Sequence, residues 1–138
     1  MDAVRIVAAP RKVLSWISER AHCALTADAR GIAAVDARGN IRGMVAYDGW
    51  TENACQAHMA VDSPIVWRHL VRPAFQYPFL QAGKNVLVGV IPSHNERSVE
   101  MTRALGFIEK HRIADGWAPG DDMIVFEMRR SECRWLEV

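Results

Sequence analysis

The sequence predicts an α/β protein in which helices pack on a mixed β-sheet. Two patterns carry this prediction: a run of short strands joined by tight turns in the first half, and a helix–strand–helix crossover followed by two strands in the second. Hairpins pair strands antiparallel, whereas a crossover through a helix allows a parallel pair. Half of the 138 residues are apolar, which is enough to bury the core of a single domain spanning residues 1–138.

The first half is predicted to be an antiparallel meander. Pro10 opens a helix over residues 11–20, in which Val13, Leu14 and Ile17 recur at helical spacing. The turn around Gly39 is typical of a hairpin, because Gly and Asn tolerate positive φ. The predicted strands cover residues 4–8, 31–36, 41–47 and 54–61.

The second half changes to alternating helices and strands. A helix over residues 67–81 contains Pro73 and Pro78, which must kink or divide it. A nearly continuous apolar strand over residues 85–91 is typical of a strand covered on both faces. Ser93 and Glu96 have the spacing of a capping box for the next helix, which ends at Gly106. Two strands are predicted at the end, over residues 107–113 and 123–129, with a turn over 117–120.

Charge and cysteine content exclude several classes of protein. The chain has 17 basic and 16 acidic residues, so it lacks the basic excess of a nucleic-acid-binding protein. Three widely spaced cysteines with no C-x-x-C pair favour neither a disulfide framework nor a structural metal site. No run approaches the ~20 apolar residues of a membrane span, and we expect a cytoplasmic protein without a membrane partner.

A group of motifs in the last third of the chain resembles a known family. An apolar strand over residues 86–90 is followed by Asn95, Ser98 and Met101, then by Leu105-Gly106-Phe107, and Gly120-Asp121-Asp122 leads into the apolar run 123–128. This joint spacing resembles the GNAT superfamily of acetyl-CoA-dependent N-acetyltransferases, and within it the ribosomal-protein N-terminal acetyltransferases.

The resemblance implies a site for acetyl-CoA as co-substrate. In this fold the strands that correspond to residues 54–61 and 86–90 start together and splay apart, and the pantetheine arm enters the gap like a short extra strand. The pyrophosphate is expected on backbone N–H groups where the next helix begins, near residues 65–69. The residues expected at the cofactor are Met59, Val61, Trp67, Arg68, His69, Val90, Asn95 and Ser98.

The implied reaction is direct attack of a primary amine on the thioester carbonyl, in a ternary complex. It needs a base for the amine proton, and the candidates are Glu52 and His58, with Asn95 orienting the cofactor arm. The residues themselves leave other roles open: Glu52 as an exposed turn carboxylate, His58 as a buried strand histidine and Asn95 as a helix cap. The acceptor is a small molecule or a protein N-terminus, and the family often forms homodimers.

Two departures from the family pattern leave a second function open. No glycine lies between Gly49 and Gly83, although the family usually has a glycine-rich turn at the phosphates, where bare backbone permits close approach. Thr102 stands where the family often has a tyrosine that protonates the departing thiolate. The alternative is therefore a non-catalytic acyl-CoA-binding or protein-interaction module on the same fold.

Overall fold

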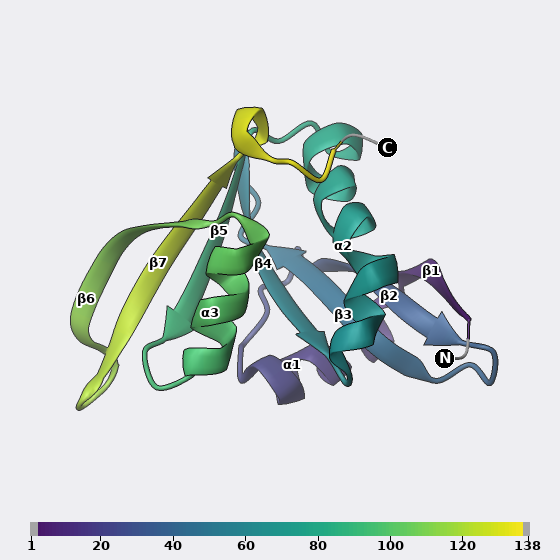
Figure 1. Cartoon of the computed structure of the whole chain (residues 1–138), viewed down its shortest axis with the longest axis horizontal. Coiled ribbons are helices and arrows are strands. Elements are labelled where there is room, and N and C mark those ends of the chain that lie inside the picture. The colour runs from purple at the N-terminus through teal and green to yellow at the C-terminus, as the bar shows by residue number, and fades with distance from the viewer. Residues whose placement is uncertain (1–2, 137–138) are drawn as a thin grey trace.

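Seven strands form one mixed sheet in the computed structural model, which describes residues 3–136 (Figure 1). Their order across the sheet is β1-β2-β3-β4-β5-β7-β6, and neighbours pair antiparallel except β4 and β5, which are parallel. The strands are β1 (Val4–Ala9), β2 (Arg30–Asp36), β3 (Ile41–Asp48), β4 (Ala54–Val61), β5 (Val86–Pro92), β6 (Ile108–Ala118) and β7 (Asp121–Arg129). The predicted α/β class, with an early meander and a later crossover, is confirmed.

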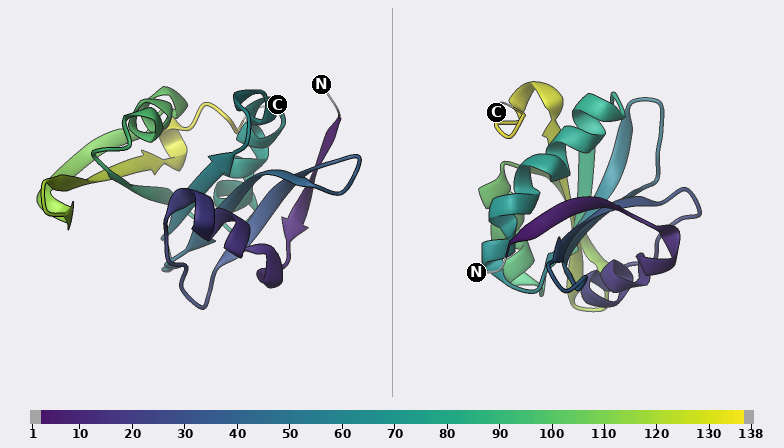
Figure 2. Two further views of the ribbon diagram at one scale, coloured as in Figure 1. Left: turned by 90° about the horizontal axis from the view of Figure 1, so that it is seen from below. Right: turned by 90° about the vertical axis from the view of Figure 1, so that its right-hand side faces the viewer.

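The helices lie on both faces of this sheet, as Figure 2 shows. Helix α1 (Ser15–Ala21) covers one face, and α2 (Trp67–Gln76) and α3 (Glu96–Leu105) cover the other. Each face has its own apolar core: Leu14 and Ile17 pack with Met44 and Ala46 under α1. Under α2 and α3 the core contains residues of β3, β4 and β5, among them Val45, Tyr47, Cys55, Ala57 and Leu87. Odd- and even-numbered residues of β3 and β4 therefore face opposite sides.

The long predicted helix is divided near Pro78. Helix α2 ends at Gln76, and a π turn follows over Tyr77–Gln81. Proline has no N–H group, so Pro78 cannot donate to the carbonyl of Ala74. The buried Tyr47 hydroxyl donates to that carbonyl instead, at 2.6 Å. The start of α2 is packed closely on β3, because a Cβ atom at Gly43 would lie 3.0 Å from Val66 Cγ1.

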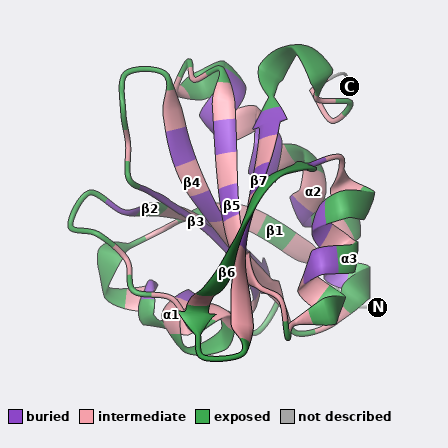
Figure 3. Cartoon of the chain, turned by 90° about the vertical axis from the view of Figure 1, so that its left-hand side faces the viewer, coloured by how far each residue is buried: buried purple, intermediate pink, exposed green. Residues whose placement is uncertain are grey.

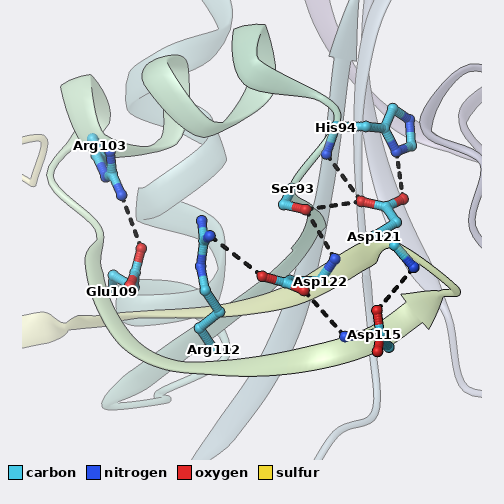
Figure 4. Close-up of polar contacts among 9 residues, drawn as sticks. Ser93, His94, Arg103, Glu109, Arg112, Asp115, Asp121 and Asp122 are labelled. Atoms are coloured by element: carbon cyan, nitrogen blue, oxygen red, sulfur yellow. Dashed lines mark hydrogen bonds and ion pairs between the residues drawn. The ribbon is translucent and has the colours of Figure 1, made fainter.

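The predicted capping box at α3 is wrong, and Figure 4 shows why. The Ser93 hydroxyl donates to Asp121 Oδ1 at 2.9 Å and accepts from the Asp122 N–H at 2.9 Å, so it is turned toward β7. Asn95 caps the helix, because its side chain accepts from the Ser98 N–H at 3.2 Å. His94 also binds Asp121, at 2.5 Å. This cluster ties the loop before α3 to the β6–β7 hairpin.

The last hairpin is longer than predicted. β6 continues to Ala118, and the turn is confined to Pro119 and Gly120. Because β6 is the edge strand of the sheet, almost all of its residues are exposed (Figure 3). Within residues 3–136, no helix has the length and apolar character needed to cross a membrane.

Candidate active site

The central feature of the site is the divergence of β4 and β5. The two strands pair at Ala54–Val86, Cys55–Leu87 and Gln56–Val88 and then separate, as Figure 1 shows. β4 keeps its β3 partner to Val61, and β5 keeps its β7 partner to Pro92. Beyond Gln56 and Val88, each strand therefore turns one backbone edge toward the gap.

A cleft of about 1010 Å³ occupies this gap. One wall is the end of α1 and the residues after it, from Arg20 to Ala24. The opposite wall comes from α3, with Asn95, Arg97 and Ser98, and from Trp67 at the start of α2. The remaining lining comes from the diverging strands, 56–61 and 89–92, and from Trp117 and Met123 of the β6–β7 hairpin.

On the α1 side, His58 is held by a buried carboxylate. His58 Nε2 lies 2.8 Å from Asp48 Oδ1, and the two side chains are 10% and 4% exposed. A carboxylate accepts hydrogen bonds, so Nε2 carries the hydrogen and Nδ1 is the basic nitrogen of the neutral ring. The register explains the pair: Asp48 is opposite Gln56 and Ala46 opposite His58, which makes Asp48 and His58 diagonal neighbours on one face.

The loop after α1 completes this side. The Thr26 N–H donates to Asp48 Oδ2 at 3.0 Å, so Asp48 joins the α1–β2 connection to His58. Cys23 lines the cleft, and burial together with the negative charge of Asp48 raises the pKa of its thiol. Cys23 is therefore a protonated thiol beside the pair.

Within residues 3–136, two indole donors, Trp50 Nε1 and Trp67 Nε1, are buried without a partner. Of the two side chains, Trp67 lines the cleft, on its α2–α3 side. The turn before it offers few N–H groups: Pro64 has none, Val66 donates to Ser63 O at 3.0 Å, and Trp67 donates back into the turn. Asp62 lies at the same turn and binds Arg42 Nε at 2.5 Å.

Most residues expected at the cofactor or the reaction line this cleft. They are Met59, Val61, Trp67, Val90, Asn95 and Ser98, together with His58. Arg68 and His69 do not line it; they are exposed on α2. Glu52 is exposed in the turn before β4, at the end where β4 and β5 are still paired, and does not line the cleft either. Its position gives no support to a role as base.

Sequence reasoning missed three charged residues near the cleft. Asp48 directly follows the strand predicted over residues 41–47, and the hairpin register brings it beside His58. Arg20 and Arg97 each lie near a helix end and carry no local motif, so only the fold shows that they line opposite walls.

Solved structures share this architecture. Spermidine N-acetyltransferase SpeG from Vibrio cholerae, in complex with CoA and spermine, superposes with a TM-score of 0.74 at 14% identity, over 97% of this chain and 98% of that chain. A chimera of SpeG from Vibrio cholerae and hSSAT gives 0.77 at 15% identity, over 97% and 99%. The dodecameric enzyme from Vibrio cholerae gives 0.72 at 14% identity, over 93% and 94%.

The chain has the GNAT fold. At 14–15% identity these structures establish the fold alone, and no family model and no curated protein matches the sequence. All three structures are spermidine N-acetyltransferases, so they do not support the narrower resemblance to the ribosomal-protein branch.

Proposed function

We propose that this protein is an N-acetyltransferase that transfers an acetyl group from acetyl-CoA to a primary amine. The observation that carries the proposal is the Asp48–His58 pair at a cleft between two diverging strands. GNAT-fold structural neighbours that are N-acetyltransferases, one of them bound to CoA and spermine, support it.

The cleft fits the acyl-CoA arm at several points. The free edges of residues 57–61 and 89–92 provide backbone donors and acceptors for an extended amide chain. Trp67 Nε1 is a buried donor that needs an acceptor. Arg97 lines the α3 wall and is exposed, so it is a suitable cation for the phosphates. The turn at residues 62–67 contributes little to phosphate binding, since Pro64 lacks an N–H and Asp62 is acidic.

Residues on the α1 side supply the base. His58 and Asp48 lie on the face of β3 and β4 that α1 covers, opposite Met59 and Val61. The amine enters from this face, and His58 Nδ1 removes its proton. Acetyl-CoA supplies a thioester whose carbonyl carbon forms the new C–N bond as its C–S bond breaks, with the electron pair leaving on the CoA sulfur. Asp48 orients the ring and stabilises the imidazolium that forms.

The first test is a thermal-shift titration with acetyl-CoA, with an adenosine nucleotide as control. At about 100 times the dissociation constant a ligand stabilises the folded state by about 2.7 kcal/mol. We expect a saturable shift with acetyl-CoA that the nucleotide does not reproduce, and release of free CoA when an amine is added. The absence of any shift at millimolar acetyl-CoA would overturn the proposal.

The non-catalytic alternative predicts a different outcome. A binding module would give the acetyl-CoA shift without CoA release from any amine. The glycine-free turn and Thr102 favour this alternative. Thr102 is only 7% exposed, and its hydroxyl donates to Ser98 O at 2.7 Å, so the hydroxyl is not placed to act as an acid. The homodimer expected from the family is a prediction that light scattering tests.

A further inference from the structure

The charges that line the cleft are unevenly distributed. Among the described lining residues, Asp62 is the one carboxylate, and Arg42 pairs with it. Asp48 lies behind His58, and its two oxygens already accept from His58 and from the Thr26 N–H. A polyamine acceptor carries several positive charges, and no lining carboxylate on the α1 side is available to receive them.

Basic side chains stand on the α1 wall instead. Arg20 and His22 both line the cleft there, on the same side as His58. The Arg20 side chain is 44% exposed. Its Nη1 donates to Trp16 O at 3.0 Å, and its Cζ atom lies 3.9 Å from the centre of the Trp16 ring. Glu19 Oε2 forms an exposed ion pair with Nη1 at 4.0 Å, which is beyond hydrogen-bond distance.

This arrangement leaves Arg20 prepared for an anion. Stacking on Trp16 orients the planar guanidinium, and a guanidinium has five N–H donors, of which the Trp16 carbonyl accepts one. Paired N–H groups of arginine match the two oxygens of a carboxylate. A polycation would meet the positive charge of Arg20, which is unfavourable in a partly enclosed cleft.

We propose that the acceptor is a small amine that carries a carboxylate, with Arg20 binding the carboxylate while the nitrogen lies at His58. The inference rests on the proposed acetyl transfer and names its substrate class. It separates this protein from its structural neighbours, one of which is bound to spermine. The inference also argues against protein N-termini as acceptors, because the α-carboxyl group of the first residue is part of an uncharged peptide bond.

Matched amines test the inference. Lysine and cadaverine differ by one carboxylate, as do phenylalanine and phenethylamine; phenylalanine amide and spermidine represent a peptide end and a polyamine. The measurement is kcat/KM for CoA release at saturating acetyl-CoA. We expect the native protein to prefer each acid over its decarboxylated partner by about tenfold or more, since a charge-assisted hydrogen bond contributes about 1.5–3 kcal/mol.

Two variants separate recognition from the intrinsic reactivity of the amines. Arg20→Gln should reduce the preference for the acid at least severalfold, with little change for the decarboxylated partner. Arg5→Gln removes one exposed charge on β1, away from the cleft, and should keep the native preference. The melting temperature of each variant verifies its folding. An unchanged preference in Arg20→Gln would overturn the assignment of Arg20.

The outcomes distinguish this inference from the proposed function. Transfer to cadaverine or spermidine as fast as to lysine would overturn the inference and support the acetyltransferase. If acetyl-CoA binds but is transferred to no amine, the inference is tested by the binding of lysine and cadaverine in competition for the CoA-bound protein. Equal binding of the two amines would overturn the inference. No transfer and no acetyl-CoA shift would overturn both.

Discussion

The two sides of the cleft differ in how fully their polar groups are organised. On the α1 side, hydrogen bonds of 2.8 and 3.0 Å join the buried Asp48 carboxylate to His58 and to the Thr26 N–H. On the α2–α3 side, Trp67 Nε1 has no acceptor within residues 3–136. In the turn at residues 62–67, the Val66 and Trp67 N–H groups donate within the turn and the Asp62 N–H donates to Arg42 O. The side assigned to the acceptor is pre-organised, whereas the side assigned to acetyl-CoA relies on strand edges and single side chains.

This difference separates the roles that we expect for the two sides of the cleft. Buried polar groups are costly to leave unpaired, so a fully paired buried network at a cleft indicates the position of the reacting groups. An incomplete phosphate turn lowers affinity without removing the reacting groups. Changes on the α1 side should therefore alter turnover, and changes on the α2–α3 side should alter cofactor affinity.

The largest effect is expected at the base. His58→Gln retains a polar group that can contact Asp48 but has no basic nitrogen, so kcat should fall by about 10²- to 10⁴-fold. The acetyl-CoA thermal shift should persist, because Met59, Val61 and Trp67 are unchanged. Near-native CoA release by this variant would remove His58 from the mechanism.

The second effect concerns the partner that orients the ring. Asp48→Asn presents an amide donor to Nε2, which turns Nδ1 into the protonated nitrogen. Turnover should fall by up to about 10⁴-fold, the cost of holding a catalytic histidine in the wrong tautomer. Asp28→Asn is the matched control: Asp28 lies in the α1–β2 connection that Asp48 contacts, and it accepts from the Trp50 N–H at 3.2 Å, off the cleft. Equal losses in both variants would indicate loop disruption rather than loss of orientation.

The rate at which the cysteines are alkylated tests whether CoA and the amine acceptor occupy the α1 side of the cleft. Burial raises the pKa of the Cys55 thiol to about 12, so Cys55 should not react with iodoacetamide at pH 8. Cys23 and Cys133 are half-buried with raised pKa values and should react slowly. CoA together with an amine acceptor should protect Cys23 alone, because Cys133 does not line the cleft. Mass spectrometry of the labelled peptides measures this, and parallel protection of Cys133 would point to a global change instead.

A smaller effect is expected for a charge on the opposite wall. Arg97→Gln should raise KM for acetyl-CoA by about 3- to 10-fold, less than a buried charge-assisted hydrogen bond would contribute, because Arg97 is exposed to solvent. Acetyl-pantetheine, which has no nucleotide phosphates, should be used equally well by both proteins. If the variant loses activity with both thioesters, Arg97 acts on something other than the phosphates.

The smallest effect is expected at Thr102. Its hydroxyl already donates to Ser98 O, at 2.7 Å. Thr102→Val should leave kcat unchanged and lower the free energy of unfolding by about 1 kcal/mol at most. A large loss of kcat, measured alongside urea denaturation, would restore Thr102 as a catalytic group.

The sequence by itself determined the local elements and the order in which they occur. The strand at residues 54–61, the hairpin turn at Gly39 and the helix end at Gly106 depend on short-range patterns of apolar residues and on backbone freedom, and the structure confirms them. The resemblance to the GNAT superfamily also implied which strands diverge, and seven of the ten residues expected at the site line the cleft there.

Only the tertiary structure decided which polar groups meet. Ser93 binds Asp121, 28 residues later, so it cannot cap the adjacent helix. Asp48 meets His58 because the register of two strands brings them together, and Arg20 and Arg97 face one cleft from opposite sides of the sheet. Hydrogen bonds and charges act over a few ångströms in space, whereas a sequence records separation along the chain. Strand register and the packing of helices on the sheet bring residues that are far apart along the chain close together in space, and neither can be read from local sequence patterns.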